Sequence, residues 1–197
     1  MSTEAAALRA EMDKAVSLSE LAAEVAELKQ RVASLPAGPE NKLSMVVFSG
    51  DLDKLLASMI IATGAAAMGM KVVLFFTFWG TAALRDANKK VGGKDFMSRM
   101  FGWMLPKGHG ALKLSQMHMG GMGTSMLKGL MKKKNAPSLD QLFDMASQLG
   151  VEIKVCEMSM DLMGFKREEL IDYPNLEFVG VATFLAHAKN SANQLFI

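Results

Sequence analysis

The stretch KLSMVVFSGDLDKLLASMIIATGAAAMGMKVVLFFTF, residues 42–78, decides the fold of this chain. Its two ends, residues 42–49 and 72–78, are short apolar runs rich in β-branched and aromatic residues, which indicates strands buried on both faces. The mainly apolar segment 51–70 between them has the length of a helix and ends near a glycine. A strand, a helix and a second strand in this order predict a parallel crossover unit.

The alternation of strands and helices continues to the end of the chain. Further strands are predicted at 151–156 and 176–179, with a short edge strand at 195–197. Helices are predicted between and after these strands, at 81–91, 138–149, 165–171 and 182–193. We therefore expect an α/β fold, a Rossmann-like doubly wound parallel sheet of four to five strands. Ligands of such sheets bind at the carboxyl ends of the strands.

Residues 3–35 are predicted to form one helix whose apolar residues repeat with the spacing of a coiled-coil seam. The spacings alternate between three and four residues at Leu18, Leu21, Val25, Leu28, Val32 and Leu35. This seam favours self-association of the chain, and the alternative is a single amphipathic helix packed on its own domain. Two prolines within residues 36–40 end the helix and form a linker, and the α/β domain is expected at 41–197.

The overall composition excludes several classes of protein. The chain has 197 residues and a formal charge of +2, which gives no general affinity for nucleic acid or membranes. Its single cysteine excludes an internal disulfide and is typical of a reducing compartment, so a cytoplasmic location is expected. The N-terminus lacks the pattern of a secretory signal, and the longest uncharged run, residues 55–70, is too short to span a bilayer.

Residues 92–136 are predicted to be an irregular insertion rich in methionine, glycine and lysine. Twelve of the eighteen methionines lie between residues 97 and 163. Methionine suits adaptable contact surfaces, and an ordinary soft core is the alternative. Eleven bases and two acids at 85–134 give a local charge of +9. This basic segment can make peripheral contact with a membrane or an acidic partner, or it can be a solvated surface.

Cys156 closes the predicted strand 151–156 and is therefore expected at the carboxyl edge of the sheet. A helical turn predicted after it places backbone N–H groups where they stabilise a thiolate, whereas the adjacent Glu157 opposes it. A reactive thiol and an inert buried side chain both fit this position. His109 and His118 lie in glycine-rich segments, and either can reach the cysteine through a folded loop as a base or a pocket residue.

No metal, cofactor or nucleic-acid partner is expected. The three histidines and the cysteine lack the paired spacing of a structural zinc site. A Met/His cluster at 117–122 fits Cu(I) only in its ligand types. The chain also lacks the GxGxxG and GxxxxGKS/T motifs that bind phosphates.

Residues 150–172, GVEIKVCEMSMDLMGFKREELID, contain the signature Cys-x-Met-Ser-Met-Asp-x-Met-Gly, which begins at Cys156. Three other segments accompany it, FFTFWG at 75–80, MGGMGT at 119–124 and GVATFL at 180–185. Together they resemble the DsrE/DsrF-like family. The resemblance is collinear over residues 42–197 and does not include the N-terminal heptads.

The resemblance implies a Rossmann-like sheet, assembly into homo-oligomers, and transfer of sulfane sulfur as a cysteine persulfide between a donor and an acceptor protein. The family's carrier cysteine corresponds to Cys156, and Ser159, Asp161 and Gly164 are expected to support the loop around it. Some relatives have a second cysteine. Because this chain has none, its relay requires the thiol of another protein or of a small molecule. The alternative is a non-catalytic oligomeric interaction module that uses the heptad helix and the basic Met-rich segment.

Overall fold

The computed structural model describes residues 2–34, 38–89 and 91–197, with side chains from residue 18 onward. The chain divides into two compact units, Met1–Gly38 and Pro39–Ile197. In the second unit, the described residues form one sheet of five parallel strands in the order β4-β3-β2-β1-β5. The strands are β1 (Glu40–Val47), β2 (Lys71–Phe76), β3 (Glu152–Cys156), β4 (Leu176–Val179) and β5 (Ser191–Phe196).

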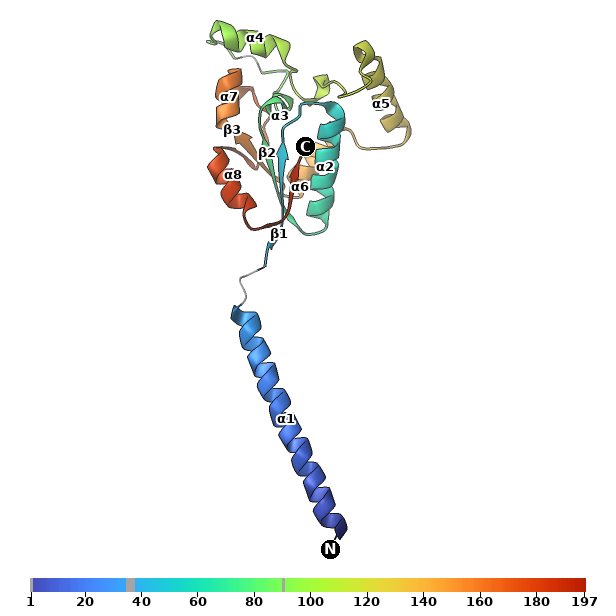
Figure 1. Ribbon diagram of the computed structural model, residues 1–197. Helices are drawn as coiled ribbons and strands as arrows, with labels where there is room; N and C mark the ends of the chain where they lie inside the picture. Colours follow the sequence, from blue (N-terminus) through green and yellow to red (C-terminus); the bar gives the residue numbers. More distant parts are fainter. Residues whose placement is uncertain (1, 35–37, 90) are drawn as a thin grey trace. The chain divides into compact units, whose positions relative to one another are not determined.

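Helices cover both faces of this sheet, because the chain crosses it in two directions. From β1 to β4 each strand is placed beside the previous one, and the chain then returns to place β5 beside β1. Right-handed crossovers in the first direction put α2 (Leu52–Ala67) and α6 (Leu139–Gln148) on one face. The return crossover puts α8 (Val181–Ala188) on the other face (Figure 1). The predicted α/β fold with a doubly wound parallel sheet is therefore confirmed.

The two faces of the sheet have separate cores, since successive side chains of a strand point to opposite sides. On the face covered by α2 and α6, Met45, Leu74 and Ile153 are fully buried in the larger core. The face covered by α8 has a much smaller core, made of Val73, Phe75, Cys156, Val179, Phe184 and Ala188. The thiol therefore lies in the thinner of the two layers.

The segment predicted to be irregular, residues 92–136, contains helices. They are α4 (Phe96–Met104), the single turns η1 (His109–Ala111) and η2 (Met119–Gly121), and α5 (Met122–Lys133). Scattered glycines hide α5 in the sequence, yet Gly123 is needed where it stands. A Cβ atom at Gly123 would collide with the backbone oxygen of Met117. The close approach of these two backbone segments thus explains why glycine, which disfavours helices, occupies this position in α5.

Three predicted helices are shorter than expected. The helix predicted at 81–91 is only α3 (Trp79–Ala83), and that predicted at 165–171 is the single turn η3 (Arg167–Glu169). The segments that follow these two helices pair with each other in an isolated antiparallel β-bridge between Arg85 and Leu170. In this bridge the backbone N–H of Ile171 donates to the backbone oxygen of Leu84 at 2.8 Å. The last helix ends at Ala188 because β5 begins at Ser191. Long-range pairing has replaced local helix propensity in each case.

The unit Met1–Gly38 consists of the helix α1 (Ser2–Ser34). The five described seam residues, from Leu18 to Val32, are exposed in the single chain. Leu35 and positions 36 and 37 of the predicted linker lie outside the described residues. Self-association through the seam stays a prediction. Among the described helices, none combines the length and the apolar character that crossing a bilayer requires.

Candidate functional site

Cys156 is the last residue of β3 and the N-cap of α7 (Glu157–Met163). The strand end and the helical turn that the sequence predicted around it are thus both present. Cys156 pairs in register with Val179 of β4, at the carboxyl edge of the sheet. Its side chain is 3% exposed and belongs to the small core under α8. Within the described part of the chain, no hydrogen bond to its sulfur is found.

The small core that contains the thiol includes an aromatic stack. Phe184 of α8 lies on Phe75 of β2 with ring centroids 4.6 Å apart and planes inclined by 11°. Both rings are buried in the same cluster as Cys156. Stacked rings exclude water from the sulfur but make no polar contact with it. Access to the thiol therefore requires movement of α8 or of the turn at the start of α7.

Ser159 ties the first turn of α7 to the neighbouring strand. Its hydroxyl is fully buried and lies 2.8 Å from the Oγ1 atom of Thr77, which follows β2. The next residue, Phe78, has a φ of 44°, in the left-handed region that non-glycine residues rarely adopt. Backbone strain of this kind is commonest at functional sites. The Thr77–Ser159 contact fixes the turn that follows the cysteine.

Gly164 ends α7 in a left-handed conformation, with φ 64° and ψ 33°. A Cβ atom at this position would also collide with Ser98 of α4. Gly164 is thus required both by its backbone angle and by the close approach of α4. Asp161, in contrast, is exposed and lines an open hollow of about 470 Å³ beside α7. In the described residues, its side chain forms no hydrogen bond that would support the cysteine loop.

The negative charge next to the cysteine is balanced. Glu157 forms an ion pair with Arg167, whose guanidinium lies 4.6 Å from the centroid of the Phe178 ring. Both partners of this pair are substantially exposed, so the pair is a modest interaction. Glu157 therefore has a cationic partner of its own beside the cysteine.

The structure does not bring the two candidate histidines to the cysteine. His109 Nε2 lies 2.7 Å from Asp140 Oδ1, and its ring contacts Phe143 of α6, on the face opposite to Cys156. His118 Nδ1 lies 3.0 Å from the hydroxyl of Thr124. His109 does line a cavity, but one that belongs to the α2 and α6 side of the sheet. The placement gives no support to a role for either histidine as the base for Cys156.

Sequence reasoning missed a buried ionic cluster next to α7. Glu169 forms ion pairs with Arg85 and Lys94; Arg85 and Glu169 are buried, and Lys94 is partly buried. Arg85 also donates to the backbone oxygens of Gly102 and Pro106, and its guanidinium lies over the ring of Phe165. Burial lowers the pKa of Arg85, and Glu169 opposes that effect. In the sequence these residues look like solvated charges, because nothing in their spacing shows that they meet.

The described residues contain no group of three or more His, Cys, Asp and Glu side chains placed to hold a metal ion. The site therefore consists of one thiol buried with two stacked aromatic rings, a helical turn held by the Thr77–Ser159 contact, and the ionic cluster around Glu169. Such an arrangement can hold a nucleophilic sulfur away from water and release it when the cover moves.

Two curated proteins and one solved structure are similar to this chain. YrkE of Bacillus subtilis (strain 168) is 44% identical over 156 residues, which cover 79% of this chain and 96% of that protein. The sulfur carrier protein DsrE2 of Allochromatium vinosum is 33% identical over 161 residues, covering 80% of this chain and 99% of that protein. The crystal structure of the ychN protein from E. coli has a TM-score of 0.43 and 13% identity, over 79% of this chain and 98% of that one.

The sequence model of a family describes most of the chain. The model of the DsrE/DsrF/DrsH-like family matches residues 39–196, which is the whole of the α/β unit apart from its last residue. The α1 helix lies outside the match. On this match and on the relatives above, the chain belongs to the DsrE/DsrF/DrsH-like family.

Proposed function

We propose that this chain is a sulfur carrier that accepts sulfane sulfur on Cys156 and passes it to another protein. The observation that carries the proposal is the place of the chain's only cysteine, which ends β3 at the carboxyl edge of the sheet. Membership of the family and the 33% identity to a protein named as a sulfur carrier support it. No prosthetic group is required, because the chemistry needs only thiols.

The transfer is an exchange between sulfur atoms. The thiolate of Cys156 attacks the outer sulfur of a donor persulfide, the sulfur–sulfur bond of the donor breaks, and the donor leaves as a thiolate. Cys156 then carries one additional sulfur atom as a persulfide. The thiolate of an acceptor protein repeats the step on that outer sulfur, and Cys156 returns to its starting state. No net oxidant or reductant is consumed, and no second cysteine in the chain is needed.

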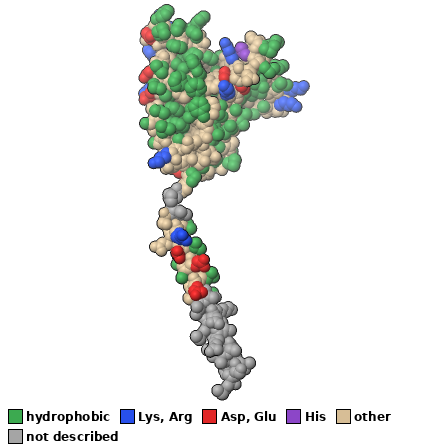
Figure 2. Space-filling model, in the orientation of Figure 1, with side chains coloured by type: hydrophobic (Ala, Val, Ile, Leu, Met, Phe, Trp, Pro, Cys, Tyr) green, Lys and Arg blue, Asp and Glu red, His purple; other side chains and the backbone are tan. Residues whose placement is uncertain are grey.

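Because Cys156 is buried, the proposed relay requires a closed state and an open state of the chain. In the closed state, the stack of Phe75 and Phe184 keeps water and oxidants away from the sulfur. Transfer requires an open state, which the docking of a donor or acceptor would favour. Apolar side chains for such docking are exposed on the two elements next to the cysteine, Met158 and Leu162 on α7 and Val181 and Leu185 on α8. Figure 2 shows hydrophobic side chains gathered over the part of the molecule where these helices lie.

Intact-protein mass spectrometry tests the proposal directly. After incubation with glutathione persulfide and removal of excess reagent, the chain should gain the mass of one sulfur atom, and reduced glutathione should remove it. Cys156→Ser should gain nothing. A Ser125→Cys substitution in that background, on the exposed face of α5, controls for reagent activity. The proposal fails if the wild type gains no sulfur while the relocated cysteine does.

We also propose that the chain assembles into homo-oligomers and that its α4 helix makes peripheral contact with membranes. The seam of α1 is exposed and is available for pairing with a second copy. Four apolar residues of α4 are exposed as well, namely Phe96, Met97, Trp103 and Met104, and Trp103, at 85% exposed, lines a hollow together with Arg99 and Lys107. Sedimentation with vesicles that contain phosphatidylserine tests the second idea. Trp103→Ala should reduce binding at low salt, and equal binding of the two proteins would contradict it.

A further inference from the structure

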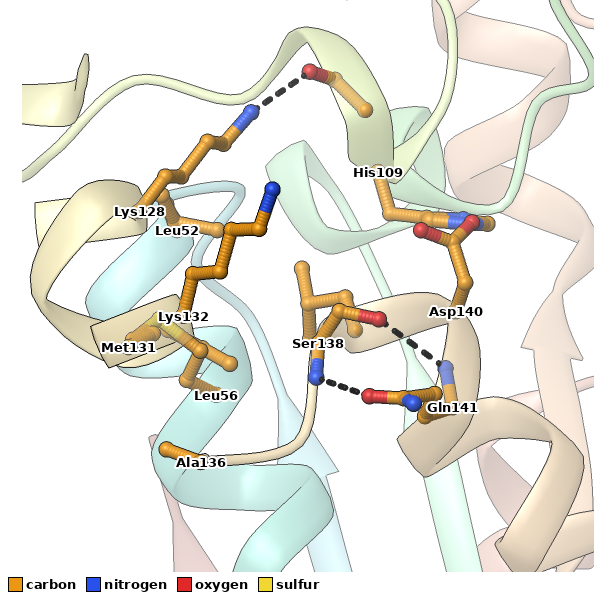
Figure 3. A pocket seen from close by; sticks show the side chains of 12 residues that line it. Leu52, Leu56, His109, Lys128, Met131, Lys132, Ala136, Ser138, Asp140 and Gln141 are labelled. Atoms are coloured by element: carbon orange, nitrogen blue, oxygen red, sulfur yellow. Dashed lines mark hydrogen bonds and ion pairs between the residues drawn. The ribbon is translucent and has the colours of Figure 1, made fainter. Parts of the chain in front are cut away.

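The cavity that His109 lines lies on the side of the sheet away from the cysteine. It has a volume of about 350 Å³ and is enclosed by the first turns of α2, by α5 and by the start of α6 (Figure 3). The first turn of α2 follows the carboxyl end of β1, and the start of α6 lies at the opposite end of that helix from β3. The cavity therefore lies at the carboxyl edge of the sheet, where folds of this class bind ligands. None of its lining residues takes part in the chemistry proposed for Cys156.

The floor of the cavity is apolar. Leu52 and Leu56 of α2 and Leu139 of α6 are buried residues of the main core that also border the cavity, and Met131 of α5 lines it as well. The space exists because α5 stands away from the sheet, with only Gly123 and Thr124 of that helix buried (Figure 1). A volume at the lower end of the usual range for ligand pockets, roughly 300–1,000 Å³, suits one short hydrocarbon chain.

The opening of the cavity is cationic. Lys128 and Lys132 stand four residues apart on α5, so they share one face of the helix, and Figure 3 shows both beside the cavity. Lys128 Nζ donates to the backbone oxygen of Gly110, at 3.0 Å, its one hydrogen bond among the described residues. For Lys132, the described part of the chain supplies no hydrogen bond or ion pair. The acid on the opposite wall, Asp140, is already held by His109.

Two like charges at this spacing repel each other, and a bound anion between them removes that cost. We propose that the cavity binds a small organic anion with an unbranched apolar tail, the tail on the leucine floor and the anionic group between Lys128 and Lys132. Carboxylate, sulfonate and phosphate headgroups share this chemistry. A polar anion would leave the floor unfilled, and a neutral or cationic chain would leave the two lysines without a counter-charge.

Calorimetry on the full chain tests this, with octanoate, octanesulfonate, octyl phosphate, octanol and octyltrimethylammonium as probes. We expect at least one of the three anions to bind once per chain, with the order among them identifying the headgroup. Octanol should bind about tenfold more weakly, since one charge-assisted contact is worth roughly that factor. Octyltrimethylammonium should not bind. Hydrogen exchange should show protection of residues 122–133 on binding.

Matched variants separate this site from its surroundings. Lys132→Gln should weaken binding several-fold, whereas Lys133→Gln, an exposed neighbour that does not line the cavity, should leave it unchanged. Ala136→Trp should fill the opening and abolish binding while the circular dichroism spectrum is retained. Cys156→Ser should bind like the wild type, so failure of the sulfur relay would not affect this result. Absence of binding by all three anions, equal binding of octanol, or equal effects of the two lysine variants would overturn the proposal.

Discussion

Replacing Phe184 with alanine tests whether α8 shields the thiol. The ring of Phe184 is 5% exposed and stacks on Phe75 with centroids 4.6 Å apart, directly in the cluster that contains Cys156. Removing a buried phenylalanine ring costs about 3–5 kcal/mol. We take the lower end, about 3 kcal/mol, because this core is small and lies close to solvent on the outer side of α8.

The same loss should make the thiol more reactive. If labelling requires local opening of α8, lowering the opening free energy by about 3 kcal/mol accelerates labelling by about a hundredfold. The assay is the rate of reaction with a chromogenic disulfide reagent in native buffer, normalised to the rate in denaturant. Urea denaturation of the same variants supplies the global free energy of unfolding.

Two variants control for global effects. Phe143→Ala removes a ring that is also 5% exposed, but from α6 on the opposite face of the sheet. It should destabilise the chain by a similar amount and accelerate labelling much less than Phe184→Ala. Leu185→Ala, at a position 59% exposed on α8, should change neither quantity. If Phe143→Ala and Phe184→Ala accelerate labelling equally, the reagent reports global unfolding, and the idea of a local cover is refuted.

Three further variants test the site, an ion pair and the N-terminal helix. Gly164→Ala should destabilise the chain in urea by more than about 1 kcal/mol, because a left-handed alanine costs roughly 1–2 kcal/mol and its methyl group collides with Ser98. Glu177→Gln should reduce the loss of unfolding free energy that occurs as the pH falls into the acid range, measured by urea titrations at successive pH values. The hydrogen bond from Lys154 holds the pKa of Glu177 below its usual value of 4.5, so the stabilisation present above that pH is lost as the pH falls through the lowered pKa. Leu28→Asp should lower the molar mass measured by light scattering, because a charge in the seam opposes pairing of helices.

Each of these variants has a matched control. Gly129→Ala, on α5 with open space around it, should be neutral or stabilising, and a loss equal to that of Gly164→Ala would contradict the argument. Glu168→Gln removes a charge that does not contact Lys154, and it should leave the loss of unfolding free energy at acid pH unchanged. Gln30→Asp adds the same charge as Leu28→Asp outside the seam. If both α1 variants reduce the molar mass equally, net charge rather than the seam is responsible.

Much of the fold could be predicted because its signals are local. Residues 42–78 form β1, α2 and β2 within a few residues of the predicted bounds, and β4 was predicted at its observed bounds, Leu176–Val179. Ser138 and Gln141 form a capping box at the start of α6, which begins at Leu139, one residue from the predicted start at 138. The errors fall where distant segments compete, as at Leu84 and Ile171, whose backbone bond ends two predicted helices. A sequence pattern shows which secondary structure a segment prefers locally. It does not show which distant segment will pair with it and override that preference.

The candidate site was predictable to a similar extent. The position of Cys156 at a strand end follows from the apolar run before it, and the helical turn after it was also expected. The buried contact between Thr77 and Ser159 was not, because it joins residues 82 positions apart. The cluster of Arg85, Lys94 and Glu169 was missed for the same reason. The placement of His109 against Asp140 likewise depends on how the 92–136 segment folds back.

By itself, the sequence determined that this chain has a parallel α/β sheet with its single thiol at a carboxyl edge, since apolar periodicity and chain order specify both. The tertiary structure alone decided that the thiol lies in a small core with Phe184 of α8, that the two histidines lie elsewhere, and that a cationic, apolar-floored cavity opens on the other face. The physical reason is the alternation of side chains along β3. One step along the strand separates Val155, in the large core, from Cys156, in the small one, and only the packed helices show what covers each side.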